Sequence, residues 1–298
     1  MITCPICGGL LVIDSRLSKC NRQHEFQVID GIVDLMPSIT DKNMLNEEQH
    51  WDSVAKKGRM KIMPDVYTQG KVFETIRTII KQSIIREWPD YKSKNVCIGE
   101  IGCASGSAIS YLDGLEFSKV NYVGVDISLN ELQLGVKRRL PDNWEAQFVR
   151  TSVNVPVFNE NSINIIFSAS VLHHLELESV MKWLSKSLKS KGLFILYEPS
   201  DRNPLAKIGR KLIDPNFFTE SERPISANQV KQLAYKYNLK LIFEKGLHFL
   251  TVPLGYLFGI LNLPKQVVYC IYPISRLFDY IITSPSWSYS FIQIYKKI

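Results

Sequence analysis

The sequence predicts an α/β fold with a largely parallel sheet, and two stretches carry this prediction. Residues 95–101 are a short apolar run that ends near Glu100 and passes into small residues between Gly102 and Gly106. Glycine adopts backbone angles closed to other residues, and small side chains let a ligand approach the main chain. Residues 120–126 form a second apolar run that ends in Asp126. Neighbouring parallel strands would place both carboxylates at one edge of the sheet.

This arrangement resembles the class I S-adenosylmethionine-dependent methyltransferases. Their first motif is an acid followed by Gly-x-Gly-x-Gly with small residues tolerated in the middle, and here the motif reads Glu100, Gly102, Ala104 and Gly106. A nicotinamide-binding turn would need Gly-x-Gly-x-x-Gly, which Ala104 and Ser107 disfavour. The resemblance implies a seven-stranded Rossmann-like sheet whose last strand is antiparallel.

The resemblance also implies the cofactor site. Gly102 to Gly106 would pass under S-adenosylmethionine, Glu100 would lie near its methionyl amino group, and Asp126 would accept hydrogen bonds from the ribose hydroxyls, as an ionised carboxylate can. The full set of implied cofactor residues is Glu100, Gly102, Ala104, Gly106, Asp126, Ile127, Thr151, Ser152 and Ser168.

Two positions depart from the family pattern. Thr151 stands where the adenine-contact loop usually carries an acid, so the contact lacks charge assistance and should be weaker. Asn164 stands where family members commonly have Asp at the start of the fourth strand. These departures keep open a non-catalytic binding or scaffolding protein on the same fold.

Composition places the chain among globular proteins with one large domain or two unequal ones. It has 298 residues, 45% of them hydrophobic and 22% charged. The net charge of +7 suits an anionic partner, whether nucleic acid, a phosphorylated substrate or an acidic lipid surface, but the basic residues are scattered. The N-terminus lacks the pattern of a signal peptide, so the expectation is a cytoplasmic protein, with peripheral membrane contact as an alternative.

Residues 1–37 predict a small zinc-binding lobe. Cys4 and Cys7 form one knuckle, and Cys20 and His24 form a second. Three thiolates and one imidazole suit tetrahedral zinc, and a segment this short needs a bound metal ion to fold. The alternative is a metal-free ribbon with reduced cysteines. The segment resembles the zinc-ribbon lobe of bacterial large-subunit rRNA guanine methyltransferases, and also the small zinc modules of many other methyltransferases.

The remaining elements follow in order along the chain. Residues 38–69 are expected to form a linker and a lid-like helix, in which Trp51 and Tyr67 either cover the cofactor site or simply pack. Residues 70–298 would form the methyltransferase domain. Helices are predicted at 70–88, from a capping box at Ser128 to about 139, at 176–190 with Gly192 as a left-handed cap, and from Ser226 onward. Strands are predicted at 145–149, 163–170, 193–197, 240–244 and 288–295.

Two polar residues at strand ends are candidates for the chemistry. His173 lies in a Val-Leu-His-His phrase familiar from small-molecule methyltransferases, and a histidine at the carboxyl edge of a sheet could act as a base. The alternative is a turn histidine with no role in proton transfer. Glu198 opens onto the same edge and could contact substrate, although a strand-end glutamate is often only solvated.

An apolar insert interrupts the expected hairpin before the last strand. Residues 251–284 predict a helical cap that packs on the domain, lines an acceptor pocket through residues such as Phe258 and Leu261, or rests on a membrane. Residues 203–212 predict a short basic helix near an anion or a membrane surface, or merely a solvated face. The sequence thus favours a methyltransferase of a small-molecule or lipid- or glycan-linked acceptor, with rRNA base methylation as the alternative.

Overall fold

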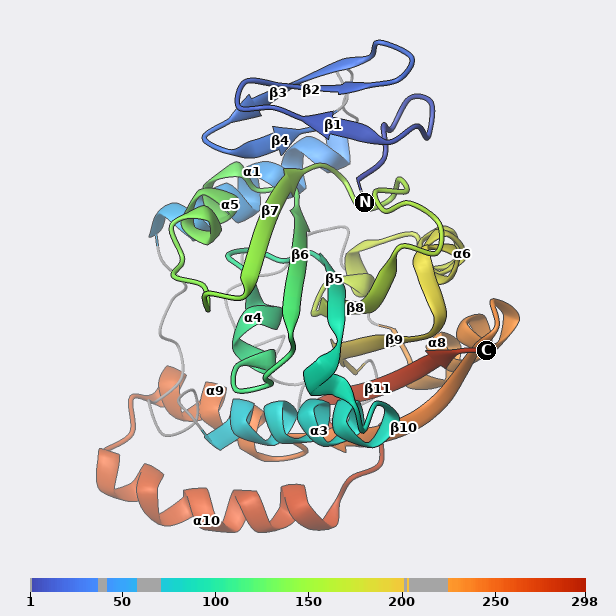
Figure 1. Cartoon of the computed structure of the whole chain (residues 1–298). Coiled ribbons are helices and arrows are strands. Elements are labelled where there is room, and N and C mark those ends of the chain that lie inside the picture. The colour runs from blue at the N-terminus through green and yellow to red at the C-terminus, as the bar shows by residue number, and fades with distance from the viewer. Residues whose placement is uncertain (1, 37–41, 58–70, 201–202, 204–224) are drawn as a thin grey trace.

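The computed structural model describes residues 2–36, 42–57, 71–200, 203 and 225–298 (Figure 1). Within them, one continuous sheet has the strand order β1-β2-β3-β4-β7-β6-β5-β8-β9-β11-β10. Tyr67 and residues 204–212, which carry two of the sequence predictions, lie outside the described residues.

The central strands confirm the Rossmann-like sheet. β5 (Asn95–Ile101), β6 (Lys119–Asp126), β7 (Trp144–Arg150), β8 (Ile163–Ala169) and β9 (Leu188–Pro199) are parallel to one another. β11 (Ser290–Lys297) runs antiparallel to β9 and to β10 (Leu239–Leu247), as expected. Most side chains of β5 and β8 are fully buried, which explains their nearly continuous apolar sequence.

Helices cover both faces of this sheet. The side chains of α6 (Leu177–Ser187) and α8 (Ala227–Lys236) pack into one core, and those of α3 (Lys71–Glu87), α4 (Ser107–Leu112) and α5 (Leu129–Val136) pack into the other. A single 3-10 turn, η1 (Tyr91–Ser93), leads into β5. Two predicted N-caps are confirmed: Ser128 Oγ accepts from Glu131 N at 3.2 Å, and Ser226 Oγ accepts from Gln229 N at 3.1 Å.

Two predicted helix ends are wrong. α5 ends at Val136 rather than near 139, and α6 ends at Ser187, after which β9 begins directly. Lys191 rather than Gly192 has the positive φ, at +62°. A Cβ on Gly192 would stand 2.8 Å from the carbonyl oxygen of Lys189 and 3.1 Å from that of Asn164. This glycine therefore permits close backbone approach within the sheet, which a sequence pattern does not distinguish from a helix cap.

The N-terminal lobe is part of the main sheet. β1 (Leu11–Ile13), β2 (Leu17–Cys20), β3 (Glu25–Ile29) and β4 (Ile32–Asp34) are antiparallel in series, and β4 then pairs in parallel with β7. Leu35 N donates to Arg150 O at 2.8 Å, and the Arg150 guanidinium pairs with Asp34 Oδ2 at 2.8 Å. The described sheet thus has 11 strands, whereas the sequence predicted seven and a lobe beside them.

Three more helices complete the described chain. α1 (Lys42–Lys57) packs against α5, and its Glu48 contacts the Arg150 guanidinium. The predicted insert is helical: α9 (Thr251–Leu261) and α10 (Lys265–Ile281) form a small core of their own around Phe258, Val268 and Tyr272. In Figure 1, α10 lies outermost, beyond α3. No helix among the described residues is long and apolar enough to cross a bilayer.

Candidate functional site

The turn after β5 lies at the carboxyl end of the parallel strands. Gly102, Ala104 and Gly106 have φ angles of +62°, +46° and +90°. A Cβ on Gly102 would stand 1.9 Å from Cγ2 of Val171, so no side chain fits there. The small residues of the motif therefore allow a compact turn in which the motif's own side chains leave the main chain uncovered.

Asp126 joins this turn to the next one. At the end of β6, its Oδ2 accepts from Ala104 N at 2.7 Å and its Oδ1 accepts from Ser128 N at 2.9 Å. Burial raises the pKa of Asp126 to about 6, against the opposing effect of these two amides. The residue remains partly exposed, and each carboxylate oxygen has a further lone pair for a hydroxyl donor.

Glu100 lies fully buried beneath the turn. Its oxygens accept from Ser107 Oγ at 2.5 Å, from Ala108 N at 2.9 and 3.0 Å, and from Tyr122 Oη at 2.5 Å. Burial raises the pKa of Glu100 to about 7 even though these donors oppose the shift. Through these bonds Glu100 supports the start of α4. Its carboxylate lies below the turn, deeper than the open surface where a ligand would contact the turn.

The other predicted cofactor residues gather near the same strand ends. Thr151 N donates to the Asp126 carbonyl oxygen at 3.0 Å, and the Thr151 hydroxyl donates to the carbonyl oxygen of Leu35 at 3.4 Å. Ser152 is buried beside Thr151, whereas Ile127 is partly exposed. Ser168, fully buried near the end of β8, has a hydroxyl with no partner among the described residues. Such an orphan hydroxyl is unusual in a buried site.

Asn164 lies at the opposite end of the sheet from these residues. Its Oδ1, near the start of β8, accepts from Cys97 N at 2.9 Å and from Lys189 Nζ at 3.0 Å. The replacement of the customary Asp is thus compensated by structural hydrogen bonds. It has no bearing on the strand ends where the candidate site lies.

His173 and Glu198 form a buried pair. His173 lies in the short 3-10 helix η2 (Leu172–His174), and its Nδ1 is 2.8 Å from Glu198 Oε2. Glu198 Oε1 accepts from the backbone amides of Val171 and Leu172, both at 2.9 Å. Because an ionised carboxylate only accepts, Nδ1 is the donor in this hydrogen bond, and Nε2 is the ring nitrogen that Glu198 does not hold. Glu198 therefore orients His173 and is itself fully buried.

α1 contacts both sides of this site. Trp51 lies edge-on to the ring of His174, with centroids 5.9 Å apart, and Trp51 Nε1 donates to Glu47 Oε2 at 3.1 Å. The next residue of the helix, Asp52, accepts at Oδ1 from Ser128 Oγ at 2.6 Å, and Ser128 lies two residues after Asp126. Sequence reasoning singled out Trp51 but missed Glu47 and Asp52, because acids on an amphipathic helix give no signal of their tertiary partners.

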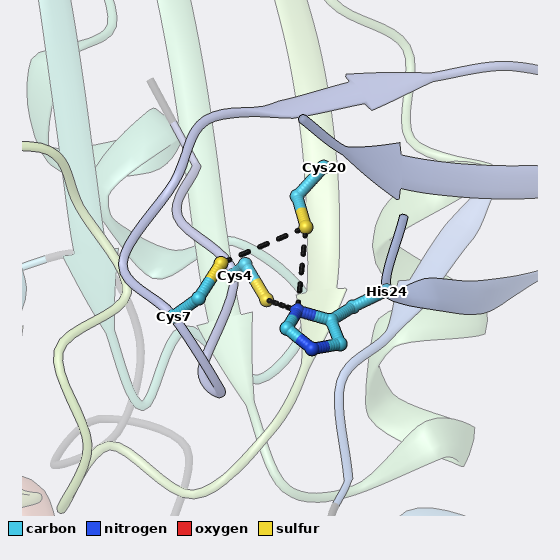
Figure 2. Close-up of side chains that lie close together, drawn as sticks. All are labelled: Cys4, Cys7, Cys20 and His24. Atoms are coloured by element: carbon cyan, nitrogen blue, oxygen red, sulfur yellow. Dashed lines mark hydrogen bonds between the residues drawn. The ribbon is translucent and has the colours of Figure 1, made fainter. Parts of the chain in front are cut away.

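The four predicted metal ligands come together in the N-terminal lobe, as Figure 2 shows. The Sγ atoms of Cys7 and Cys20 are 3.6 Å apart, and His24 Nδ1 lies 3.5 Å from Cys4 Sγ and 3.4 Å from Cys20 Sγ. Ligands about 2.3 Å from one zinc ion stand about 3.8 Å apart in a tetrahedron. The donor set and its spacing therefore fit a structural zinc ion.

The thiols of this cluster are in different environments. Burial raises the pKa of Cys4. Burial has the same effect on Cys20, but the backbone amides of His24 and Arg22 and the neighbouring thiols outweigh it and lower the pKa of Cys20 to about 6. None of the six cysteines forms a disulfide in this structure. A thiolate at Cys20 is the form that binds a metal ion.

Comparisons with known proteins identify the central part of the chain. Residues 99–196 match the family model described as "Methyltransferase domain". This segment resembles a methyltransferase domain. It contains the turn from Gly102 to Gly106, Asp126, Thr151 and His173, and it ends two residues before Glu198.

Solved structures show the fold of the methyltransferase domain extended over most of the chain. Geranyl diphosphate C-methyltransferase from Streptomyces coelicolor A3(2) superposes with a TM-score of 0.55 at 12% identity, covering 88% of this chain and 100% of that one. Haemonchus contortus phosphoethanolamine N-methyltransferase 2 gives 0.55 at 14% identity, covering 87% of this chain and 60% of that one.

A third similar structure contains an activator protein. A chain of a Haloferax volcanii complex with the Trm112 methyltransferase activator gives a TM-score of 0.52 at 10% identity, covering 87% of this chain and 99% of that one. At these identities the likeness shows the fold alone. No curated protein sequence matches the chain.

Proposed function

We propose that the protein is an S-adenosylmethionine-dependent methyltransferase that acts on a small-molecule or a lipid- or glycan-linked acceptor. The observation that carries the proposal is the turn from Gly102 to Gly106, tied to Asp126 through Ala104 N, inside a methyltransferase domain. Residues 1–37 would be its zinc-binding lobe, residues 38–69 its linker and covering helix, and residues 70–298 its catalytic unit, in which 251–284 form an apolar helical insert.

The residues at the strand ends fit the cofactor. The small side chains of residues 103–105 let the methionine part approach the main chain of the turn, and the Ser168 hydroxyl has no partner among the described residues. Asp126 would accept the ribose hydroxyls, while Ile127, Thr151 and Ser152 would surround the adenine. Glu100 would act from below, by holding the turn and offering negative charge toward the cofactor's ammonium group. When bound, S-adenosylmethionine supplies a methyl group activated by its sulfonium.

His173 and Glu198 would serve the acceptor. An O–H or N–H acceptor must lose a proton as the new bond to the methyl group forms, and a neutral His173 can take that proton at Nε2. Glu198 keeps the imidazole in the required tautomer and stabilises the imidazolium. Because the methyl donor is already activated, orientation of the acceptor supplies much of the rate enhancement.

Several observations favour a small or lipid-linked acceptor. The Val-Leu-His-His phrase resembles that of small-molecule methyltransferases, and its Val171 packs directly against the glycine turn. Two proteins of the same fold are named for geranyl diphosphate and phosphoethanolamine, both phosphorylated small molecules. The net charge of +7 would favour acceptors with an anionic group.

The function can be tested in two steps. Calorimetry with S-adenosylhomocysteine should show binding that Asp126→Ala weakens by about 1.5–3 kcal/mol, as for a hydrogen bond to a charged group. Asp113→Ala, at an exposed carboxylate after α4, is the matched control. Labelled S-adenosylmethionine and fractionated cell extract should then place the label in small molecules or lipids. Unchanged affinity in Asp126→Ala would rule out the cofactor site.

The second candidate is rRNA base methylation. It is favoured by the zinc-ribbon-like lobe, which resembles that of rRNA guanine methyltransferases, and by the basic net charge. Label recovered in RNA, together with an RNA affinity that falls steeply with salt, would establish this candidate over the first. No methyl transfer and no cofactor binding would instead indicate a scaffolding role.

A further inference from the structure

The helix α10 is amphipathic, but its polar side faces the protein and its apolar side faces outward. Asp279 Oδ1 accepts from the amides of Leu250 and Thr251 at 2.8 and 3.2 Å, which caps the start of α9. Arg276 donates to Thr75 Oγ1 of α3 at 3.3 Å, and the Ser275 hydroxyl donates within the helix. These contacts fix the rotation of α10 about its axis.

The outward side of α10 is apolar after its first two residues. Its exposed side chains from Val267 onward carry no charge; they are Val267, Tyr269, Cys270, Pro273, Ile274, Leu277, Phe278, Tyr280 and Ile281. α9, which packs on α10, adds exposed Leu257, Ile260 and Leu261. Turning this surface inward would pull Asp279 and Arg276 away from their partners. Monomeric proteins rarely leave so large an apolar surface in water.

Charge indicates what covers this surface. Between Gly246 and Ile298, Asp279 is the single acidic residue of the sequence, and it is buried and occupied by backbone amides. Lys265 is exposed at the start of α10, and the whole chain carries a net charge of +7. An anionic surface therefore meets no exposed carboxylate on α9 or α10 themselves. A protein interface would be expected to carry a surrounding rim of charged or amide groups, whereas the exposed residues of α10 include such groups only in the first turn, at Lys265 and Gln266.

The aromatic residues suit the same partner. Tyr269 and Tyr280 lie toward the two ends of α10, and Trp287 follows the helix; all three are exposed. Tyr and Trp favour the boundary between lipid headgroups and acyl chains. Since no described helix could span a bilayer, α10 would lie in the plane of the boundary with its apolar side down.

We propose that α9 and α10 form a docking surface for an anionic lipid membrane. The docking stands on its own observations and holds whether or not the proposed methyl transfer is correct. It would nevertheless bring lipid close to the candidate site, because the insert leaves the sheet after β10, where His248 lies edge-on to Tyr197, the residue before Glu198. Centroids of these two rings are 6.5 Å apart.

The test is vesicle flotation with the full chain. Vesicles of phosphatidylcholine mixed with phosphatidylglycerol should carry the protein upward, and vesicles of phosphatidylcholine alone should carry much less. Leu277→Glu should weaken vesicle binding about tenfold or more, because it removes one leucine side chain from contact with the lipid and adds a negative charge that the anionic headgroups repel. Leu134→Glu on α5 is the matched control, since the two leucines are 56% and 51% exposed. It should bind as the unaltered protein does.

A second measurement does not depend on how the variants fold. Cys270 is exposed on the outward side of α10, so an environment-sensitive fluorophore attached there should shift to shorter wavelength when anionic vesicles are added. Labelled Cys270→Ser protein gives the background from other thiols. The proposal is overturned if the unaltered protein binds neither kind of vesicle, or if Leu277→Glu and Leu134→Glu bind anionic vesicles equally well. It is also overturned if Leu277→Glu instead abolishes a dimer in solution, which would make a second copy the occupant.

Discussion

Val171 Cγ2 fills the space into which a side chain on Gly102 would project, 1.9 Å from the position of its Cβ. The cofactor turn and the Val-Leu-His-His phrase are thus packed against each other at this point. Any displacement of Val171 also disturbs Glu198, because Val171 N donates to that carboxylate.

Gly102→Ala should therefore weaken S-adenosylhomocysteine binding about tenfold or more and lower stability by roughly 1–3 kcal/mol. Calorimetry and thermal unfolding measure the two effects. Gly31→Ala is the matched control, because Gly31 also has a positive φ, +80°, but no atom within 4 Å of its Cβ position. The added variant Val171→Ala should restore part of the loss. Equal behaviour of Gly102→Ala and Gly31→Ala would refute the packing argument.

Cofactor affinity should fall in mild acid. Burial raises the pKa of Asp126 to about 6, so this carboxylate loses its negative charge as the pH drops through that value and accepts ribose hydroxyls less well. S-adenosylhomocysteine affinity should be constant above about pH 7 and decline by up to tenfold per pH unit well below about pH 6. Asp126→Asn should bind weakly at every pH without this decline. A titration by calorimetry that shows the same slope in both proteins would contradict the assignment.

Glu100 should make folding stability fall as the pH rises. Its folded-state pKa is about 7, above the ordinary 4.5, so the native protein holds the proton more tightly than the unfolded chain does. The stability that this proton provides is present in acid and is lost between about pH 4.5 and pH 7, by up to roughly 3 kcal/mol. Urea unfolding across this range should show a smaller decline in Glu100→Gln than in the unaltered protein. Identical slopes would mean that Glu100 is ionised throughout.

Metal analysis of protein purified without chelator should find about one zinc ion per chain. Cys4→Ser should lose it, whereas Cys270→Ser, at an exposed cysteine outside the cluster, should retain it. Because β4 pairs with β7, loss of the metal should also lower the unfolding temperature of the domain and not only loosen residues 1–37. Well-folded protein without zinc would show that the lobe is stable as a metal-free ribbon.

His173→Asn should lower the turnover number by about 10²–10⁴-fold with an acceptor that must lose a proton. S-adenosylhomocysteine affinity should stay within about twofold, a difference of roughly 0.4 kcal/mol. Glu198→Gln should also lower turnover, because the single oxygen of the amide cannot accept both from the backbone amides of Val171 and Leu172 and from Nδ1–H. His50→Asn on α1 serves as the control. Normal turnover in His173→Asn would leave His173 a structural role only.

The features that sequence predicted best are local ones. Ser128 and Glu131, or Ser226 and Gln229, lie three residues apart, so the pattern contains both partners of the capping bond. The glycine turn is equally compact, and its acid precedes it directly. The cluster of Cys4, Cys7, Cys20 and His24 was predictable because metal chemistry restricts which residue types can serve as ligands.

The features that sequence missed join distant residues. Asp34 and Arg150 are 116 positions apart, and three-residue β4 is too short for any periodic pattern, so its pairing with β7 was invisible. The bond between Glu198 and His173 was also missed, because a strand-end acid gives no sign of which side chain it will contact. Phe258 and Leu261 were treated alike as apolar residues of the insert, yet Phe258 is buried against α10 and Leu261 is exposed. α9 is apolar on all sides and has no periodicity from which to tell them apart.

The pairing of β4 with β7 has a consequence for the chain without its first residues. Removal of residues 1–37 would leave the amides and carbonyls of β7 opposite Ile32, Val33 and Asp34 without partners along an open strand. Such a strand is a template for pairing with other chains. The N-terminal lobe therefore covers the edge of β7, and the metal ion proposed for the lobe would help to keep that edge paired and the protein free of aggregation.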